Sequence, residues 1–215
     1  MMATALRDHL ERCPLIAILR GMTPEEAPWV LETLVAAQFR ILEVPLNSPR
    51  PFESLAYLVR HAPSEMMIGA GTVLTEAEVD GVAATGAKLV IAPNCAPSVI
   101  AAANARGLIA VPGVATPTEA FAALAAGADG LKMFPGELLP PAAVKAWRAV
   151  LPKDTLLIPT GGVTPETVAA YRAAGADGFG IGSALYKPGM SREELAQRAA
   201  AFVAAIARSS ALRHS

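Results

Sequence analysis

Cysteine and histidine are scarce in this sequence, and their scarcity excludes several kinds of site. The two cysteines among its 215 residues, Cys13 and Cys95, are too few for a disulfide framework and form no Cys-x-x-Cys motif. The three histidines, His9, His61 and His214, have no metal-ligand spacing between them. No dinucleotide-binding fingerprint or Walker A motif is present. We therefore expect a chain in a reduced, cytoplasmic environment that uses no metal and no other cofactor.

Charge is also scarce, since charged residues make up 17% of the chain and nearly cancel to a formal net charge of −1. This balance gives no electrostatic footprint for nucleic acid or for an anionic membrane surface. The sequence contains no run of about 18 consecutive apolar residues, which is the length that a transmembrane helix needs. The start of the sequence lacks the apolar region of a secretory signal. We predict that the partners of this protein are neither nucleic acids nor membranes.

Apolar residues are abundant, at 53% of the chain, and can form a large buried core. They recur in a pattern: an alanine-rich helical stretch reaches a glycine, and a short apolar run follows, at Gly86, Gly127 and Gly175. Glycine is suited to the left-handed conformation that ends a helix. The apolar runs are continuous rather than alternating, which is typical of parallel strands buried on both faces.

Eight such apolar runs, each followed by a helical segment, predict the fold class. The expected strands cover residues 15–19, 41–44, 67–70, 89–91, 109–111, 131–133, 156–158 and 178–181. Threonine followed by proline predicts helix starts at Thr23, Thr116 and Thr164. The pattern indicates a single-domain (β/α)8 TIM barrel over residues 1–215, with an extra N-terminal helix and a loose tail over 209–215. A doubly wound open sheet is the alternative, although it usually has fewer strands at this length.

Three charged residues interrupt apolar strands near the carboxyl ends, where barrels carry their functional residues. Lys132 lies in the sixth expected strand, Glu43 in the second, and Arg20 ends the first. Burial lowers the pKa of a lysine, and a neutral lysine can attack a carbonyl carbon. A buried carboxyl group can move protons, and an arginine can bind a carboxylate. The alternatives are a structural ion pair between Lys132 and Glu43 and a strand-end salt bridge at Arg20.

Two glycine-rich loops follow the seventh and eighth expected strands, at Thr160-Gly161-Gly162 and at Gly182-Ser183. Exposed backbone N–H groups in such loops bind phosphate, and barrels often place a phosphate site there. Thr72, in Gly69-Ala70-Gly71-Thr72 after the third strand, adds a hydroxyl group at the same edge. These loops predict a phosphate-binding site, although a glycine pair alone is more often a tight turn.

Five segments together resemble the class I 2-keto-3-deoxy-6-phosphogluconate and 6-phosphogalactonate aldolases. They cover nearly the whole chain in the order and spacing of that family: IAILRG (16–21), LEVPLNSP (42–49), GAGTVL (69–74), LKMFP (131–135) and GGVTPE (161–166). The resemblance implies a homotrimeric barrel that cleaves a small phosphorylated keto acid to pyruvate and D-glyceraldehyde 3-phosphate. It also implies a covalent lysine imine and no metal.

The resemblance assigns roles to individual residues. Lys132 matches the lysine that forms the Schiff base, and Glu43 matches the general acid and base. Arg20 and Thr72 match residues that hold the carboxylate end of pyruvate. The remaining matches are Phe134 in the pocket wall, Thr160 as a contact to the C4 hydroxyl, and Gly161, Gly162, Gly182 and Ser183 in the phosphate-binding loops.

Two substrates that differ only at C4 are compatible with this resemblance. The segment PLNSP after Glu43 is similar to the phosphogalactonate branch, whereas PTGG at 159–162 is similar to the phosphogluconate branch. We weight this first segment and the opening at 16–21 more heavily, and expect 2-dehydro-3-deoxy-6-phosphogalactonate as the main substrate. Some activity on the epimer is expected, and 2-dehydro-3-deoxy-6-phosphogluconate as the main substrate is the alternative. The segment 136–141 departs from both branches. A non-catalytic sugar-phosphate-binding barrel and another phosphate-binding barrel enzyme, such as an epimerase or synthase, stay open.

Overall fold

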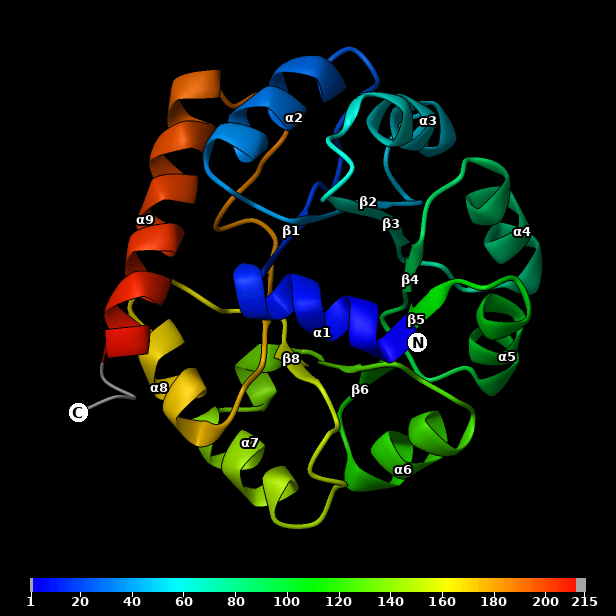
Figure 1. The fold of residues 1–215 in the computed structure, drawn as a ribbon, viewed down its shortest axis with the longest axis vertical. Helices are drawn as coiled ribbons and strands as arrows, with labels where there is room; N and C mark the ends of the chain where they lie inside the picture. Colours follow the sequence, from blue (N-terminus) through cyan, green and yellow to red (C-terminus); the bar gives the residue numbers. More distant parts are fainter. Residues whose placement is uncertain (1, 212–215) are drawn as a thin grey trace.

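Strands and helices alternate along the chain in the computed structural model, which describes residues 2–211 (Figure 1). The strands are β1 (Leu15–Ile18), β2 (Ile41–Pro45), β3 (Met67–Gly71), β4 (Leu89–Ile91), β5 (Ile109–Val111), β6 (Gly113–Val114), β7 (Leu131–Met133), β8 (Leu157–Pro159) and β9 (Phe179–Ile181). The helices are α1 (Met2–Arg12), α2 (Ala27–Ala36), α3 (Pro51–His61), α4 (Glu76–Ala84), α5 (Pro97–Ala105), α6 (Pro117–Ala125), a 3₁₀ turn η1 (Gly136–Leu138), α7 (Pro141–Arg148), α8 (Val168–Ala174) and α9 (Arg192–Ala211). Within residues 2–211, no helix has the length and apolar character needed to cross a membrane.

The strands form two parallel sheets that curl around a common centre (Figure 1). The larger sheet has the order β5-β4-β3-β2-β1-β9, and the smaller has the order β6-β7-β8. A parallel bridge between Thr160, directly after β8, and Gly180, in β9, connects the two sheets. The chain therefore has an α/β fold with a curled parallel sheet and helices on the outside.

The fifth expected strand, 109–111, is observed as β5, and a second short strand, β6, follows it after Pro112. Proline has no amide hydrogen and cannot donate to a neighbouring strand. Contacts to the next segment nevertheless continue across the division: Asp129 N donates to Ala110 O at 2.9 Å, and Lys132 N donates to Pro112 O at 2.9 Å. The prediction of one strand at 109–111 was therefore incomplete, because the run resumes beyond the proline.

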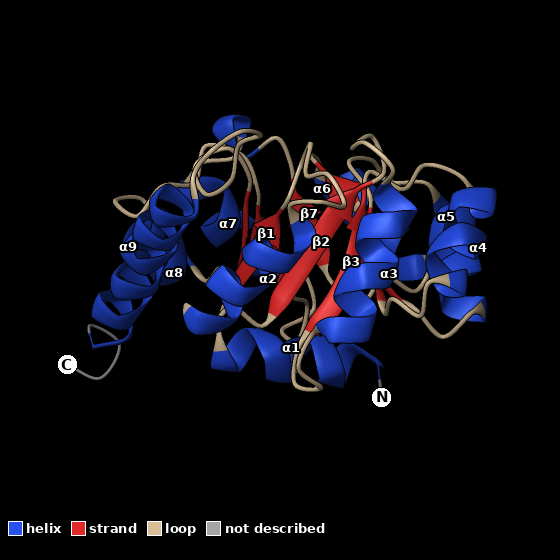
Figure 2. Ribbon diagram, turned by 90° about the horizontal axis from the view of Figure 1, so that it is seen from above, coloured by secondary structure: helices blue, strands red, loops and turns tan. Residues whose placement is uncertain are grey.

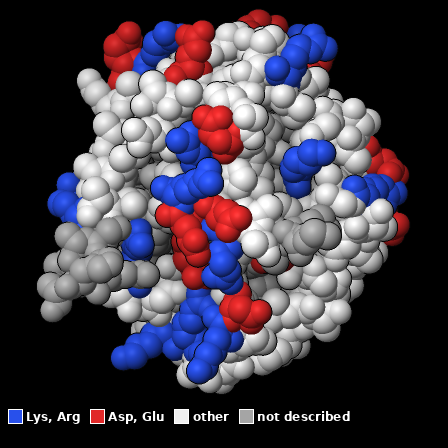
Figure 3. All heavy atoms as spheres, in the orientation of Figure 1, with Lys and Arg blue, Asp and Glu red and all other residues white. Residues whose placement is uncertain are grey.

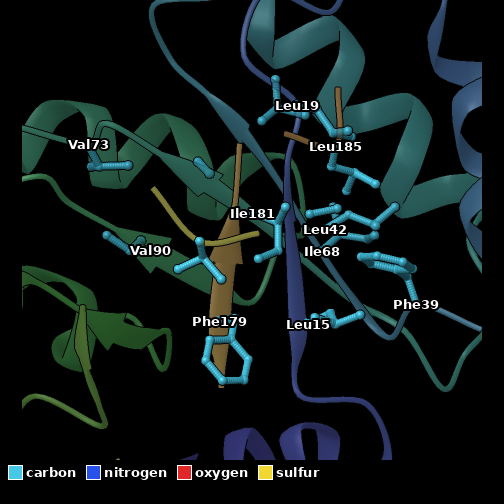
Figure 4. Packing of buried hydrophobic residues seen from close by; sticks show 14 of the residues in the cluster. Leu15, Leu19, Phe39, Leu42, Ile68, Val73, Val90, Phe179, Ile181 and Leu185 are labelled. Carbon is cyan, nitrogen blue, oxygen red and sulfur yellow. The ribbon is translucent and has the colours of Figure 1, made fainter. Parts of the chain in front are cut away.

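Side chains on successive strand positions enter two different hydrophobic clusters, as expected for a sheet with a period of two residues. Leu15 and Ala17 of β1 pack outward against the helices, whereas Ile16 belongs to an inner cluster. Figure 4 shows part of the outer cluster around β1 and β9. Leu6 and Leu10 of α1 join the inner cluster, and α1 lies beneath the strands, opposite most of the loops that follow them (Figure 2).

The helix signals in the sequence were only partly correct. Gly86, Gly127 and Gly175 have φ values of 83°, 93° and 105°, which confirms the expected left-handed helix ends. Thr116 starts α6 with a capping box, as predicted. The predictions at Thr23 and Thr164 were wrong, because each threonine opens a separate turn and α2 and α8 begin later, at Ala27 and Val168.

The expected loose tail is not observed for residues 209–211, because α9 continues through Ala211. Ser209 is buried, and its hydroxyl group donates to Ile206 O at 2.8 Å. Helix α9 therefore extends into the segment that was expected to be loose. Residues 212–215 lie outside the described part of the chain.

The amino ends of the strands carry paired charges. Arg148, the last residue of α7, forms an ion pair with Asp177, which precedes β9. Arg148 also donates to Gly175 O at 2.9 Å and to Thr155 O at 2.5 Å, and Asp177 accepts from Leu157 N at 2.7 Å. Both charged groups are thus satisfied. On the face crossed by α1, positive and negative side chains are intermingled (Figure 3).

Candidate active site

Lys132 lies in the middle of β7 and is 5% exposed. Its neighbours in the parallel register are Gly113 of β6 and Ile158 of β8. The ammonium nitrogen Nζ lies 4.9 Å from the centroid of the Phe134 ring, so the lysine has an aromatic wall on one side. Burial lowers the pKa of Lys132 below the ordinary lysine value, the charge of Glu43 opposes this, and the charge of Arg20 lowers the pKa further.

Glu43 lies in the middle of β2 and is 1% exposed. Burial raises the pKa of Glu43 to about 7, against the opposing charges of Lys132 and Arg20. Among the described residues, no group forms a hydrogen bond with its Oε2 atom. The carboxyl group packs against Gly71 of β3, where a Cβ atom would overlap it. A carboxyl group in this environment can both release and accept a proton near neutral pH.

Lys132 and Glu43 face one small internal space, of about 10 Å³, which is lined by side chains that include Ile18, Ile158 and Thr160. The charge of each group shifts the pKa of the other. Both residues lie in the described part of the chain, and no direct ion pair joins their side chains. A space of this size is close to the minimum that holds one water molecule. The structural ion pair considered from the sequence is therefore not the arrangement found.

A larger cavity, of about 440 Å³, lies at the carboxyl ends of the strands and reaches Lys132 from outside. It contains most of the residues predicted for the site: Arg20, Lys132, Phe134, Thr160, Gly161, Gly162, Gly182 and Ser183. Glu43 lies deeper, in the small internal space beside Lys132. The structure thus brings together residues from five separate predicted strands and the loops after them.

Arg20 is the second residue after β1 and presents an exposed guanidinium group to this cavity. Its Nη1 atom donates to Asn47 Oδ1 at 2.6 Å. The next residue, Gly21, donates its backbone N–H to Ser48 Oγ at 2.9 Å. The loops after β1 and β2 are therefore tied together, and they hold a positive charge near the lysine.

The two glycine-rich loops, after β8 and after β9, both line this cavity. Gly161 and Gly162 have φ values of 101° and 64°, which favour glycine and leave the backbone bare. Thr160 is buried, donates its N–H to Met133 O at 3.0 Å, and bridges to Gly180. After β9, the carbonyl group of Gly182 accepts from Leu185 N and Tyr186 N and starts a turn.

Thr72 is the one predicted site residue that lines neither cavity. It follows Gly71 with a φ of 53°, a conformation that a β-branched residue rarely adopts. Such strain persists only where the surrounding structure enforces it, and it is often found beside functional groups. Thr72 therefore sits next to the glycine that packs against Glu43, rather than at the wall of the cavity.

Two charged residues of the cavity were missed by sequence reasoning: Glu137 in η1 and Lys187 in the loop after β9. Both are exposed and lie outside the strands, so no apolar strand marked them as unusual. The departure of segment 136–141 from the family pattern was the available signal for Glu137. The position of Lys187 in the same loop as Gly182 and Ser183 was the available signal for the lysine.

A buried lysine of lowered pKa beside a buried acid, at the carboxyl ends of parallel strands and next to bare glycine loops, is typical of lysine-dependent aldolases. A family model described as KDPG and KHG aldolase matches residues 6–201. The chain belongs to this family of aldolases, which are lyases that work through a Schiff base.

Individual relatives point to one branch of the family. The chain is 52% identical over 192 residues to a "Probable 2-dehydro-3-deoxy-6-phosphogalactonate aldolase" from Rhizobium meliloti (strain 1021), covering 89% of this chain and 91% of the relative. A solved structure described as "Native KDPGal structure" is 46% identical, has a TM-score of 0.91 and covers 93% of this chain and 97% of its own. A KDPG aldolase from Legionella pneumophila with pyruvate captured as a covalent carbinolamine is 26% identical, has a TM-score of 0.77 and covers 93% and 95%.

Proposed function

We propose that this chain is a class I aldolase that cleaves 2-dehydro-3-deoxy-6-phosphogalactonate to pyruvate and D-glyceraldehyde 3-phosphate. The single observation that carries the proposal is the placement of Lys132, which is buried, has a lowered pKa and is reached from outside by the cavity. The identity to proteins of the phosphogalactonate branch, at 52% and 46%, favours that substrate over the epimer, since the KDPG aldolase compared is only 26% identical.

The fold needed for this function is a closed (β/α)8 barrel made by one domain. The Thr160–Gly180 bridge supports closure on one side of the smaller sheet. The hydrogen bonds from Asp129 N and Lys132 N to Ala110 O and Pro112 O support closure on the other side. We count β5 and β6 as one strand that Pro112 divides, which leaves eight strands around the centre. The described residues and the remaining terminal ones would then form a single aldolase domain over 1–215.

The first chemical step is attack by the neutral amine of Lys132 on the C2 ketone of the substrate. The lowered pKa of Lys132 supports this role, because only the unprotonated amine is a nucleophile. Glu43 donates a proton as the carbinolamine loses water to form the iminium ion. Its pKa of about 7 supports this transfer, and the water-sized space between the two residues can hold a water molecule that carries the proton.

The iminium ion then serves as an electron sink for cleavage of the C3–C4 bond. Removal of the C4 hydroxyl proton releases D-glyceraldehyde 3-phosphate and leaves an enamine on Lys132. Protonation of C3 and addition of water to the imine release pyruvate and restore the lysine. Because the iminium ion stabilises the developing negative charge, the proposed reaction uses neither a metal ion nor another cofactor.

The walls of the cavity divide naturally into the two ends of the substrate. The Arg20 guanidinium group would bind the carboxylate next to the reacting ketone, with Thr72 assigned to the same end and Phe134 packed beside the imine. Thr160 is assigned to the C4 hydroxyl group. The phosphate would bind to backbone N–H groups of the glycine-rich loops, at Gly161, Gly162, Gly182 and Ser183.

Two further properties follow from the proposed family role. We propose a homotrimer in the cytoplasm, and large exposed apolar residues such as Phe121 and Leu74, both 47% exposed, support an association of copies. The unpaired thiols of Cys13 and Cys95 are compatible with a reducing compartment. Light scattering of the purified chain tests the trimer, and a monomer at micromolar concentration would contradict it.

Reductive trapping tests the central proposal. Borohydride added with pyruvate should leave one reduced pyruvate adduct, seen by intact mass, and peptide mapping should place it on Lys132. An adduct on another lysine, or none, would contradict the scheme. Comparing kcat/KM for the two C4 epimers in a coupled pyruvate assay then decides the substrate. A sugar-phosphate-binding protein without catalytic activity would bind both epimers and release no pyruvate.

A further inference from the structure

The loop after β9 presents backbone N–H groups to the cavity that reaches Lys132. Ser183 and Ala184 line this cavity, and within residues 2–211 their N–H groups form no hydrogen bond. The carbonyl group before them is satisfied, since Gly182 O accepts from Leu185 N at 2.8 Å and from Tyr186 N at 3.0 Å. The loop therefore leaves two donors open to an anionic ligand, to which a backbone N–H forms a strong hydrogen bond.

The carbonyl group of Ser183 is held from outside the cavity. It accepts a hydrogen bond from Arg198 Nη1 at 3.1 Å, and Arg198, which belongs to α9, does not line the cavity. The Ser183–Ala184 peptide bond is trans. In a trans peptide group the C=O and the N–H point in opposite directions. Because Arg198 holds the carbonyl group on the outside, the N–H of Ala184 is directed toward the cavity.

The backbone of the loop does not itself satisfy Ser183 O. If the turn continued as a helix, the N–H of Lys187 would donate to this oxygen, four residues earlier. Lys187 N instead donates to Met190 Sδ at 3.2 Å, and Pro188 follows it in the chain. Without Arg198, Ser183 O would therefore have no partner among the described residues, and the orientation of its peptide group would be unrestrained.

The side chain of Arg198 is itself held in place. It lies on α9 between Leu195 and Phe202, which are both buried in the core. Helix α9 packs beside α2 and α8 (Figure 1). An ion pair with Glu194, one turn earlier, engages Nη2 of the guanidinium group. This pair offsets the positive charge, so Arg198 acts on the loop mainly through its hydrogen bond to Ser183 O.

We propose that Arg198 is a positioning residue for the terminal phosphate group of the substrate. By holding Ser183 O, it directs the N–H of Ala184 into the cavity beside the N–H of Ser183, where both donate to the phosphate. Arg198 does not touch the substrate. This inference rests on the aldolase function proposed above, and it adds two groups to the phosphate site: the N–H of Ala184 as a contact and the guanidinium group of Arg198 behind it.

Arg198→Met tests this role, because it removes the donor to Ser183 O and keeps an unbranched side chain. The KM for the phosphorylated keto acid should rise about tenfold, because a hydrogen bond to a charged group is lost. The kcat should change less than about twofold, since the phosphate is bound equally in the ground and transition states. Inorganic phosphate, used as a competitive inhibitor, should lose affinity by the same factor. Borohydride trapping of pyruvate on Lys132 should keep its rate, because pyruvate carries no phosphate.

Three further variants separate this role from a general effect on α9. Arg198→Lys keeps a donor and a positive charge and should have a KM between those of wild type and Arg198→Met. Arg192→Met removes another ion pair of the same helix, to Glu32 at 2.6 Å, and should leave KM unchanged. Glu194→Gln removes the ion-pair partner but keeps the bond to Ser183 O, and it should change KM less than about twofold. Urea unfolding checks that each variant is folded.

The failure of this inference can be told apart from failure of the proposed function. An unchanged KM in Arg198→Met, or pyruvate trapping slowed about tenfold, would overturn the inference while wild-type protein still forms the Lys132 adduct and cleaves the phosphorylated acid. If Arg198→Met does not fold, Arg198→Lys decides, and a KM equal to that of wild type would overturn the inference. If wild-type protein forms no adduct and releases no pyruvate, the proposed function fails and the inference fails with it.

Discussion

Two pairs of opposite charges, one at each end of the strands, are treated in contrasting ways. At the amino ends, Arg148 and Asp177 form a direct ion pair, and both also bond to backbone groups. Near the carboxyl ends, Lys132 and Glu43 are more deeply buried but remain apart, and Glu43 Oε2 has no partner among the described residues. The first arrangement satisfies every charge, whereas the second leaves both groups ready to exchange protons.

The two pairs therefore differ in their effect on the stability of the fold. A charge that is paired and hydrogen-bonded contributes to folding, and removing one partner is costly. A buried charge without a partner is destabilising, and its pKa shifts toward the neutral form. The comparison therefore predicts that substitutions at Lys132 and Glu43 mainly alter activity, whereas substitutions at Arg148 mainly alter the free energy of unfolding.

The largest expected effect is at Lys132. Lys132→Met should reduce kcat by at least about 10⁴-fold, because no covalent intermediate can form. Its free energy of unfolding should stay level or rise by about 1 kcal/mol, since an unpaired buried charge is replaced by an apolar side chain of similar length. Pyruvate release and urea unfolding measure the two quantities. A variant with measurable turnover and lower stability would reverse the comparison.

A somewhat smaller loss of activity is expected at Glu43. Glu43→Gln should reduce kcat by about 10²- to 10⁴-fold, because the amide cannot carry a proton, while the fold stays intact. Trapping of pyruvate on Lys132 should become slow rather than absent, which the rate of adduct formation in the presence of borohydride will show. Turnover close to that of wild type would assign the proton transfer to another group.

The same residue predicts how stability depends on pH. The pKa of Glu43 is about 7 in the folded chain and 4.5 for an ordinary glutamate, so the folded chain binds the extra proton between these values. The free energy of unfolding should therefore fall by about 3 kcal/mol as the pH rises from 4.5 to 7. Urea unfolding across this range should show the decrease in wild-type protein and a much flatter profile in Glu43→Gln. Parallel profiles would contradict the burial argument.

The smallest expected effect is at the satisfied pair. Arg148→Met should lower the free energy of unfolding by about 2 kcal/mol, because its ion pair and its hydrogen bonds to Gly175 and Thr155 are lost together. The kcat should change less than about twofold at a temperature where the variant is folded, because a stability change far from the site leaves the chemistry intact. A large drop in kcat with unchanged stability would show that the two ends are coupled.

Much of this arrangement could be predicted from the sequence. Continuous apolar runs located the buried strands, because burial on both faces requires apolar residues at every position. The same reasoning made Lys132 and Glu43 conspicuous, since a charged residue inside such a run has to be buried. The glycines at the helix ends were predicted correctly because the left-handed conformation that ends a helix is one that few other residues adopt.

Other features depend on contacts that the sequence does not reveal. Glu137 lies against Gly161 and Gly162. The backbone on either side of it is held by a hydrogen bond from Gly136 N to Thr160 O and by the Tyr171 hydroxyl, and both partners come from later in the chain. Lys187 is an exposed loop lysine in sequence terms, and only the folded chain shows that it lines the cavity. The predicted helix starts at Thr23 and Thr164 were wrong because a threonine–proline pair stabilises an isolated turn as readily as the first turn of a helix.

Helix α1 has a consequence for the distant chemistry of Glu43. Leu6 and Leu10 cap the inner apolar cluster from beneath, and Ile16, Ile91 and Ile158 of that cluster also border the space around Glu43. Deleting residues 1–10 would remove Leu6 and Leu10 and expose the inner apolar cluster to solvent. Hydration of the glutamate would then lower its pKa toward that of a surface carboxylate, and the chain would lose its proposed proton donor at neutral pH although every group lining the larger cavity remained in place.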